Sequence, residues 1–183
     1  MGSRAFLEGG RNEHLHNVPY HIQALRDCSF EFVDAMTQDP PDCDLAGQAS
    51  EVAVSCLNTI VNEILRARDD LGGNYAGSQL RSHLSKVTGS TVGVDSTQRS
   101  QYLQLAPGEG RLPGTAAQDI VLERLLQKIK HRRVDGMNYR IEPDSKHFVL
   151  VAADQTRNQT PDCVAEFDVA VFCDHCALAA SCL

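Results

Sequence analysis

Apolar residues in the first half of the chain recur at steps of three and four residues, which is the period of an α-helix. From Pro19 to Met36 this pattern predicts a helix, and the two prolines at 40 and 41 end it because they cannot donate a backbone hydrogen bond. A longer stripe from Leu45 to Ala67 predicts a second helix, which Gly72 and Gly73 end. This stripe is wide, so we expect the second helix to be central and covered on two sides.

A shorter helix is expected from Ser78 to about Val87, and it completes a helical region over residues 1–88. Residues 89–114 then hold five glycines and two prolines without a sustained period, which predicts a long irregular connection. Such a stretch is either a functional lid or a linker, and both interpretations stay open.

The pattern changes again over residues 115–183. Thr115 and Gln118 have the spacing of a capping box, and the apolar stripe behind them predicts a helix up to Arg133. A period of two follows and predicts three strands: Met137–Glu142, Lys146–Ala153 and Cys163–Cys173. The predicted fold class is α+β, with a helical N-terminal half followed by a capped helix packed on a small antiparallel β-meander, in one compact domain.

Composition limits the class of protein. The chain has 183 residues, of which 42% are hydrophobic and 22% charged, as in ordinary globular domains. We find no apolar run long enough for a membrane span and no secretory signal, so we expect a soluble cytoplasmic protein without membrane contact. A net charge of −7 argues against a surface that binds nucleic acid over its whole extent. The odd number of cysteines, seven, favours reduced thiols.

Cations nevertheless concentrate where the predicted C-terminal helix gives way to the first strand. Their planar or extended side chains suit phosphate and carboxylate groups, which makes them candidate anion-binding residues. The alternative is a solvated face, because cations also stabilise the C-terminal end of a helix. The candidates are Arg124, Lys128, His131, Arg132, Arg133 and Arg140.

Cys173 and Cys176 form a Cys-x-x-Cys pair, a spacing that commonly supplies two ligands to structural zinc. A full ligand set would need Cys182, His14 or His16 to approach through the tertiary fold. A redox pair is a further alternative, and buried thiols without chemistry are the simplest interpretation.

Glu166 and Asp168 lie two residues apart on a predicted strand, an arrangement that could hold a divalent cation in a metal-assisted hydrolase or nuclease. Acids on the wet face of a half-buried strand are also ordinary. Neither a nucleophile elbow nor a phosphate-binding glycine loop occurs in the sequence.

These observations favour a non-catalytic binding or regulatory module that acts through protein association and needs no cofactor. Its basic surface would contact an acidic partner, a phosphate-bearing ligand or RNA. An unpaired strand edge at Met137–Glu142 could recruit a second copy, so a homodimer is expected. The alternatives are the hydrolase and the zinc site described above.

Overall fold

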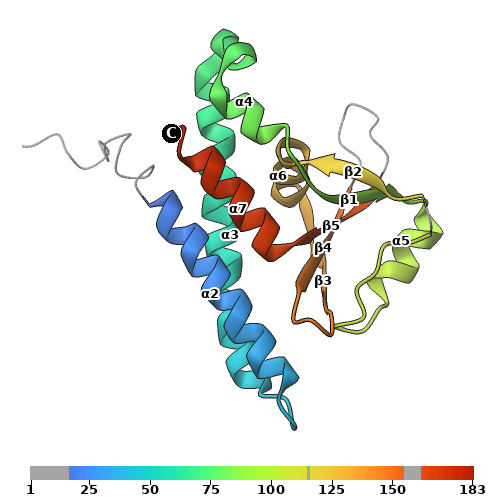
Figure 1. Cartoon of the computed structure of the whole chain (residues 1–183). Helices are drawn as coiled ribbons and strands as arrows, with labels where there is room; N and C mark the ends of the chain where they lie inside the picture. Colours follow the sequence, from blue (N-terminus) through green and yellow to red (C-terminus); the bar gives the residue numbers. More distant parts are fainter. Residues whose placement is uncertain (1–16, 115, 155–161) are drawn as a thin grey trace, which may run out of the picture.

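Two long helices form the N-terminal part of the fold in the computed structural model, which describes residues 17–114, 116–154 and 162–183. Helix α2 spans Val18–Thr37 and helix α3 spans Cys43–Leu71, as their apolar periods predicted. The Asp42 side chain caps α3 by accepting a hydrogen bond from the backbone N–H of Leu45 at 3.0 Å. The long axis of this hairpin runs past the sheet, so its turn projects beyond the rest of the molecule (Figure 1).

A five-stranded sheet with the order β2-β1-β5-β4-β3 follows, and every neighbouring pair is antiparallel. The strands are β1 (Val87–Gly93), β2 (Gln118–Val121), β3 (Arg132–Ile141), β4 (His147–Ala153) and β5 (Cys163–Asp168). The remaining helices are η1 (Gly72–Gly77), α4 (Gln79–Leu84), α5 (Ser96–Leu103), α6 (Leu122–Lys130) and α7 (Val169–Ala180). This arrangement confirms the α+β fold class.

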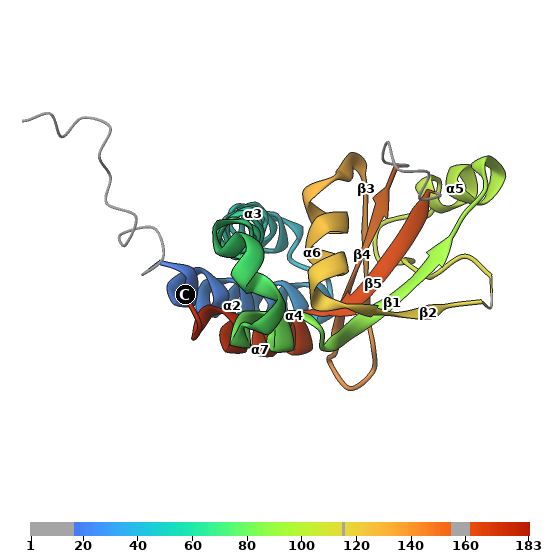
Figure 2. The same cartoon turned by 90° about the horizontal axis from the view of Figure 1, so that it is seen from above.

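The sheet lies between two layers of unequal size (Figure 2). Helices α2, α3, α6 and α7 bury one of its faces, and Val151, Ala165 and Phe167 point into that main core. Helix α5 covers the opposite face, where Leu150 and Val164 join a smaller cluster around Tyr102. Because alternate residues of β4 and β5 face opposite layers, both strands place buried apolar residues on both faces.

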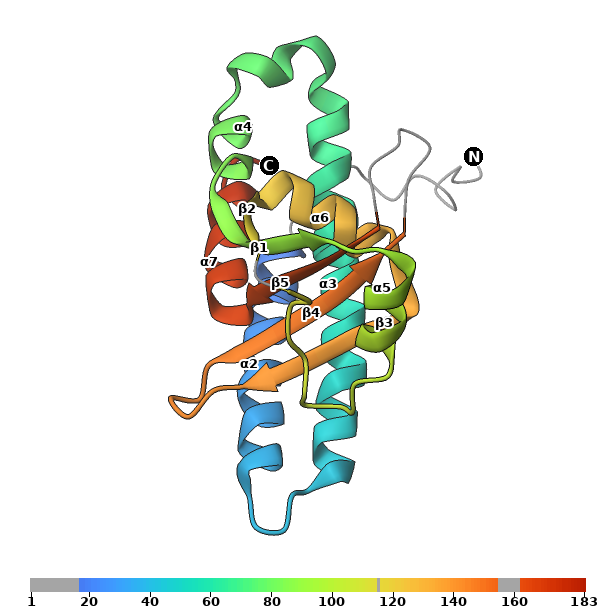
Figure 3. The same ribbon diagram turned by 90° about the vertical axis from the view of Figure 1, so that its right-hand side faces the viewer.

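Helix α7 packs beside the hairpin and connects the C-terminal segment to the N-terminal one. Arg26 of α2 donates a hydrogen bond to Asp174 of α7 at 2.7 Å, and the two helices are in contact along the layer (Figure 3). The helix layer is therefore assembled from segments at both ends of the described sequence.

The prediction of an irregular connection over residues 89–114 is wrong, because this segment contains most of β1 and all of α5. Strand β1 is rich in glycine, serine and threonine, so it lacks the apolar alternation that marks a strand. Its backbone pairs with both β2 and β5, and these hydrogen bonds place the segment in the sheet although its side chains give no strand pattern. Gly89 is required there, since a Cβ would lie 2.2 Å from the Glu166 carbonyl oxygen.

Several boundaries in the C-terminal region also differ from the prediction: α6 ends at Lys130 and β3 begins at Arg132, within the range that was expected to be helical. The expected helix over 115–133 begins only at Leu122, because Gln118–Val121 forms β2; Thr115 lies outside the described residues. The expected strand Cys163–Cys173 ends at Asp168, whose carboxylate accepts hydrogen bonds from the N–H groups of Ala170 and Val171 and starts α7. The three-stranded meander is thus the β3–β4–β5 part of a larger sheet.

No helix among the described residues is both long and apolar enough to cross a lipid bilayer.

Candidate functional site

The six predicted anion-binding residues divide into two groups in the structure. Arg140 belongs to the group that is bonded internally. Its guanidinium donates to Glu166 Oε2 at 2.7 Å and to Glu142 Oε1 at 3.0 Å, and it lies 4.7 Å from the centre of the Phe148 ring. These bonds hold Arg140 against the sheet, so it is not available to an external anion.

Arg132 and Arg133 also bond within the chain. Arg133 pairs with Asp135 at 3.1 Å and with Asp154 at 3.3 Å, which raises its pKa. Arg132 donates to Asn58 Oδ1 at 2.9 Å and to the carbonyl of Ile129 at 2.8 Å, and burial lowers its pKa. These two arginines therefore link the start of β3 to helices α3 and α6 and to the end of β4.

Arg124, Lys128 and His131 remain together, joined by Lys130, around a polar hollow of about 300 Å³ at the C-terminal end of α6. Within the described residues, no carboxylate forms an ion pair with Arg124, Lys128 or Lys130. We call this feature the cationic hollow. Its lining is Leu65, Arg68, Arg124, Gln127, Lys128, Lys130, His131, Ala153 and Asp154.

The other two charged members of the lining are already neutralised. Arg68 of α3 pairs with Glu123 at 3.2 Å and with Asp69 at 2.6 Å. Asp154 accepts hydrogen bonds from Arg99 and Arg133. The hollow therefore carries the uncompensated charge of Arg124, Lys128 and Lys130 in a protein whose net charge is −7.

Both carboxylates of the hydrolase hypothesis have structural partners. Glu166 accepts from Arg140, and Asp168 caps α7. No group of three or more histidine, cysteine or acidic side chains that could hold a metal ion occurs in the part of the chain that the structure describes. The geometry of these two residues supports their role in the fold and supplies no metal-binding cluster.

Cys173 and Cys176 lie on α7 with no exposed surface, packed in the main core. Burial raises the pKa of Cys173 to about 12 and that of Cys176 well above its ordinary value, so both are neutral thiols at physiological pH. Cys182 does not join them as a metal ligand, and His14 and His16 lie outside the described residues. The pair is part of the apolar packing.

The strand edge that was expected to recruit a second copy is partly covered by the chain itself. The Gly110 N–H donates to the Tyr139 carbonyl at 3.0 Å, and the Asn138 side chain bonds to the backbone of Gly108 and Ala106. Residues 105–110 therefore run along the middle of the β3 edge. Pairing of this edge with another copy would first require their displacement.

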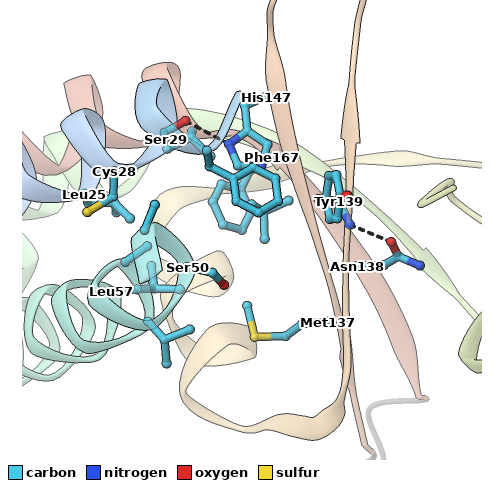
Figure 4. Close-up of a pocket in the computed structure, with 16 residues that line it drawn as sticks. Leu25, Cys28, Ser29, Ser50, Leu57, Met137, Asn138, Tyr139, His147 and Phe167 are labelled. Carbon is cyan, nitrogen blue, oxygen red and sulfur yellow. Dashed lines mark hydrogen bonds between the residues drawn. The ribbon is translucent and has the colours of Figure 1, made fainter. Parts of the chain in front are cut away.

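Sequence reasoning missed an apolar cavity of about 200 Å³ between the hairpin and the sheet. Leu25, Cys28 and Leu57 approach it from the helices, and Met137 and Tyr139 approach it from β3 (Figure 4). We call this feature the apolar cavity. Its further lining is Ser29, Phe32, Ala49, Ser50, Ala53, Val54, Asn138, His147, Val149, Phe167 and Val169.

One polar pair lies in the wall of the apolar cavity. Ser29 Oγ of α2 and His147 Nδ1 of β4 are 2.8 Å apart (Figure 4). The His147 ring stacks on Phe32, with ring centres 5.1 Å apart, and burial lowers the pKa of His147 to about 4. The imidazole is therefore neutral at physiological pH. A serine within the apolar face of a helix is the signal that the sequence offered.

Comparisons of this chain with protein-family models, with curated proteins and with solved structures return no match.

Proposed function

We propose that this chain is a binding module that receives an acidic or phosphorylated segment of a partner protein in its cationic hollow. The observation that carries the proposal is the set of cations in one concave surface, Arg124, Lys128 and Lys130, without carboxylate partners among the described residues. Like charges held together repel one another, so an anion in the hollow is favoured electrostatically.

The geometry also favours an anion that arrives on a flexible segment. Arg124, Lys130 and His131 are exposed at the rim and Lys128 is half-buried, so approach from solvent is open. Arg124 can donate two parallel hydrogen bonds to one carboxylate or phosphate, while the lysines act as point charges around it.

A protein segment fits this site better than RNA. No phenylalanine, tyrosine or tryptophan side chain lines the hollow, so His131 offers the one ring of the lining on which a base could stack. The net charge of −7 would oppose a long polyanion outside the hollow. A short acidic segment escapes most of this repulsion.

A second copy of the chain is one candidate for the partner, because its 24 acidic residues exceed its 17 basic ones. In such a homodimer the hollow of one copy would receive acidic side chains of the other. All seven cysteines are free, which fits the proposed cytoplasmic location.

The test uses fluorescence anisotropy with a fluorescein-labelled hexaglutamate peptide and its bis-phosphoserine counterpart. We expect binding that weakens when NaCl is raised from about 0.05 M to about 0.5 M. The double substitution Arg124→Gln and Lys128→Gln should weaken binding by about tenfold or more, because each lost contact is a charge-assisted hydrogen bond. Lys86→Gln is the matched control: it removes an exposed lysine outside the hollow and should leave binding within about twofold.

Two results would contradict the proposal. One is equal peptide affinity in the wild-type chain and in the double variant. The other is tighter binding of a labelled oligouridine of the same charge, which would favour RNA as the partner. Sedimentation velocity then decides on self-association: a dimer formed through the hollow dissociates in the double variant and persists in Lys86→Gln.

A further inference from the structure

The apolar cavity has room for a small molecule. Its volume is about 200 Å³, and an apolar cavity of about 150 Å³ in another protein is known to admit benzene. Helices α2 and α3 form one wall and strands β3, β4 and β5 form the other. The small side chains of Ala49 and Ala53 on α3 leave room for the cavity, and the larger Leu57 side chain on the same helix forms part of its wall. A single ring or a short branched chain fits this volume.

The lining excludes a charged ligand. Leu25, Leu57, Val149 and Phe167 present only carbon atoms, and an ion placed among them would lose its hydration without gaining a partner. Cys28 also lines the cavity, and burial raises its pKa, so its thiol is neutral. The ligand should therefore carry no formal charge.

Ser29 and His147 give the wall a hydrogen-bonded point of polar recognition, beside the exposed Ser50. The hydroxyl and the neutral imidazole hold two polar hydrogens between them, and their 2.8 Å hydrogen bond uses one. If Nδ1 accepts, the Nε2–H is left to donate; if Nδ1–H donates, the serine O–H is left. In either tautomer the pair keeps one donor for a second partner, which a hydroxyl or carbonyl oxygen of a ligand can accept.

We propose that the apolar cavity binds a neutral molecule about the size of one ring that carries a single hydroxyl or carbonyl group, with that group hydrogen-bonded to the Ser29–His147 pair. The apolar body of the ligand replaces empty space with van der Waals contacts, and the pair orients it. This site is separate from the cationic hollow, because no residue lines both.

The test is an NMR titration of the full chain, isotopically labelled at methyl groups, with phenol and with toluene as probes. We expect phenol to shift the methyl signals of Leu25, Leu57 and Val149 in a saturable way. Phenol should bind about tenfold more tightly than toluene, because only phenol can use the polar pair. Absence of a saturable shift with either probe would overturn the proposal.

Variants locate the site. Ala53→Leu fills the cavity and should weaken phenol binding by about tenfold or more, whereas Ala67→Leu on the same helix lies outside it and should leave binding unchanged. Ser50→Leu, at an exposed position of the lining, is the second filling variant should Ala53→Leu not fold. Unchanged phenol binding in a folded filling variant would contradict the assignment.

The double substitution Ser29→Ala and His147→Phe tests the polar pair, because either single substitution leaves the donor of the other residue in place. The double variant should lose most of the preference for phenol over toluene and keep the toluene affinity within about twofold, since only the polar donors are removed. A preserved preference would contradict the role of the pair. The Arg124→Gln and Lys128→Gln double variant should bind phenol normally, so this proposal can fail or succeed independently of the cationic hollow.

Discussion

The apolar cavity and the cationic hollow both lie between helices and sheet and both open to solvent, yet they are built in opposite ways. The cavity draws its lining from helices and strands that are distant in sequence, and Leu25, Leu57, Phe167 and Val169 of its wall belong to the main core. Most of the charge in the hollow comes from one helix, α6, on the side turned away from that core. The difference teaches that a charged surface can be local to one element, whereas a cavity requires the whole tertiary fold.

We predict that side chains in the wall of the cavity contribute strongly to the free energy of unfolding, whereas side chains at the rim of the hollow contribute little. Phe167 is 2% exposed and packs on Phe172 with ring centres 4.9 Å apart. Phe167→Ala should therefore cost about 3–5 kcal/mol of unfolding free energy, measured by urea denaturation. Lys130→Ala at the rim should cost no more than about 0.5 kcal/mol. A loss below about 1 kcal/mol for Phe167→Ala would show that the cavity wall is not part of the core.

The second prediction concerns pH and uses His147. Burial is the main cause of its low pKa, and the nearby Asp168 carboxylate acts in the opposite direction. The pKa in the folded state is about 4, against an ordinary value of 6.5, so the unfolded chain binds a proton first as the pH falls. Above pH 6.5 His147 is neutral in both states and does not reduce the free energy of unfolding. As the pH falls from 6.5 toward 4, the unfolded chain takes up the proton first, so the free energy of unfolding decreases.

Over that window His147 should contribute up to about 3 kcal/mol to the pH dependence of the unfolding free energy. The measurement is urea denaturation at a series of pH values for the wild-type chain and for His147→Asn. The variant should show a shallower decline between pH 6.5 and pH 4.5. Parallel curves for the two proteins would contradict a neutral, buried imidazole.

The third prediction separates the internally bonded arginines from those of the hollow. Arg140→Gln removes both carboxylate contacts of this side chain and leaves the half-buried Glu166 without its cation. We expect a cost of about 1–3 kcal/mol, measured by thermal and urea unfolding. Arg124→Gln is the matched substitution in the hollow and should not destabilise the protein. Equal costs for the two variants would break the distinction.

The smallest expected effect is a gain in stability. Arg124 and Lys128 are four residues apart on α6, where like charges repel. Arg124→Gln should therefore stabilise the chain by about 0.2–0.5 kcal/mol at low ionic strength. The gain should disappear in about 1 M NaCl, where the Debye length is about 3 Å. A gain that persists in high salt would point to helix propensity as the cause.

Local patterns predicted the elements whose side chains repeat with a clear period. Helices α2 and α3 and strand β4 lie where the apolar spacing placed them, and β3 contains most of the predicted strand Met137–Glu142 but begins five residues earlier, at Arg132. Strand β1 was missed because its small polar residues carry no such period, and its hydrogen bonds reach β5 about 75 residues further along the chain. The first turn of helix α7, up to Cys173, was mistaken for a strand because its start depends on the Asp168 cap and not on periodicity.

The sequence by itself determined that the molecule is acidic overall and that cations gather near the end of α6. Only the tertiary structure decided which of those cations stay free. Arg140 meets Glu166 because β3 and β5 lie on either side of β4, and Arg133 meets Asp154 because β3 pairs with β4. Ser29 and His147 come together because helix α2 packs beside the start of strand β4. Partners that lie tens of residues apart are set by strand pairing and helix packing, which no local pattern contains.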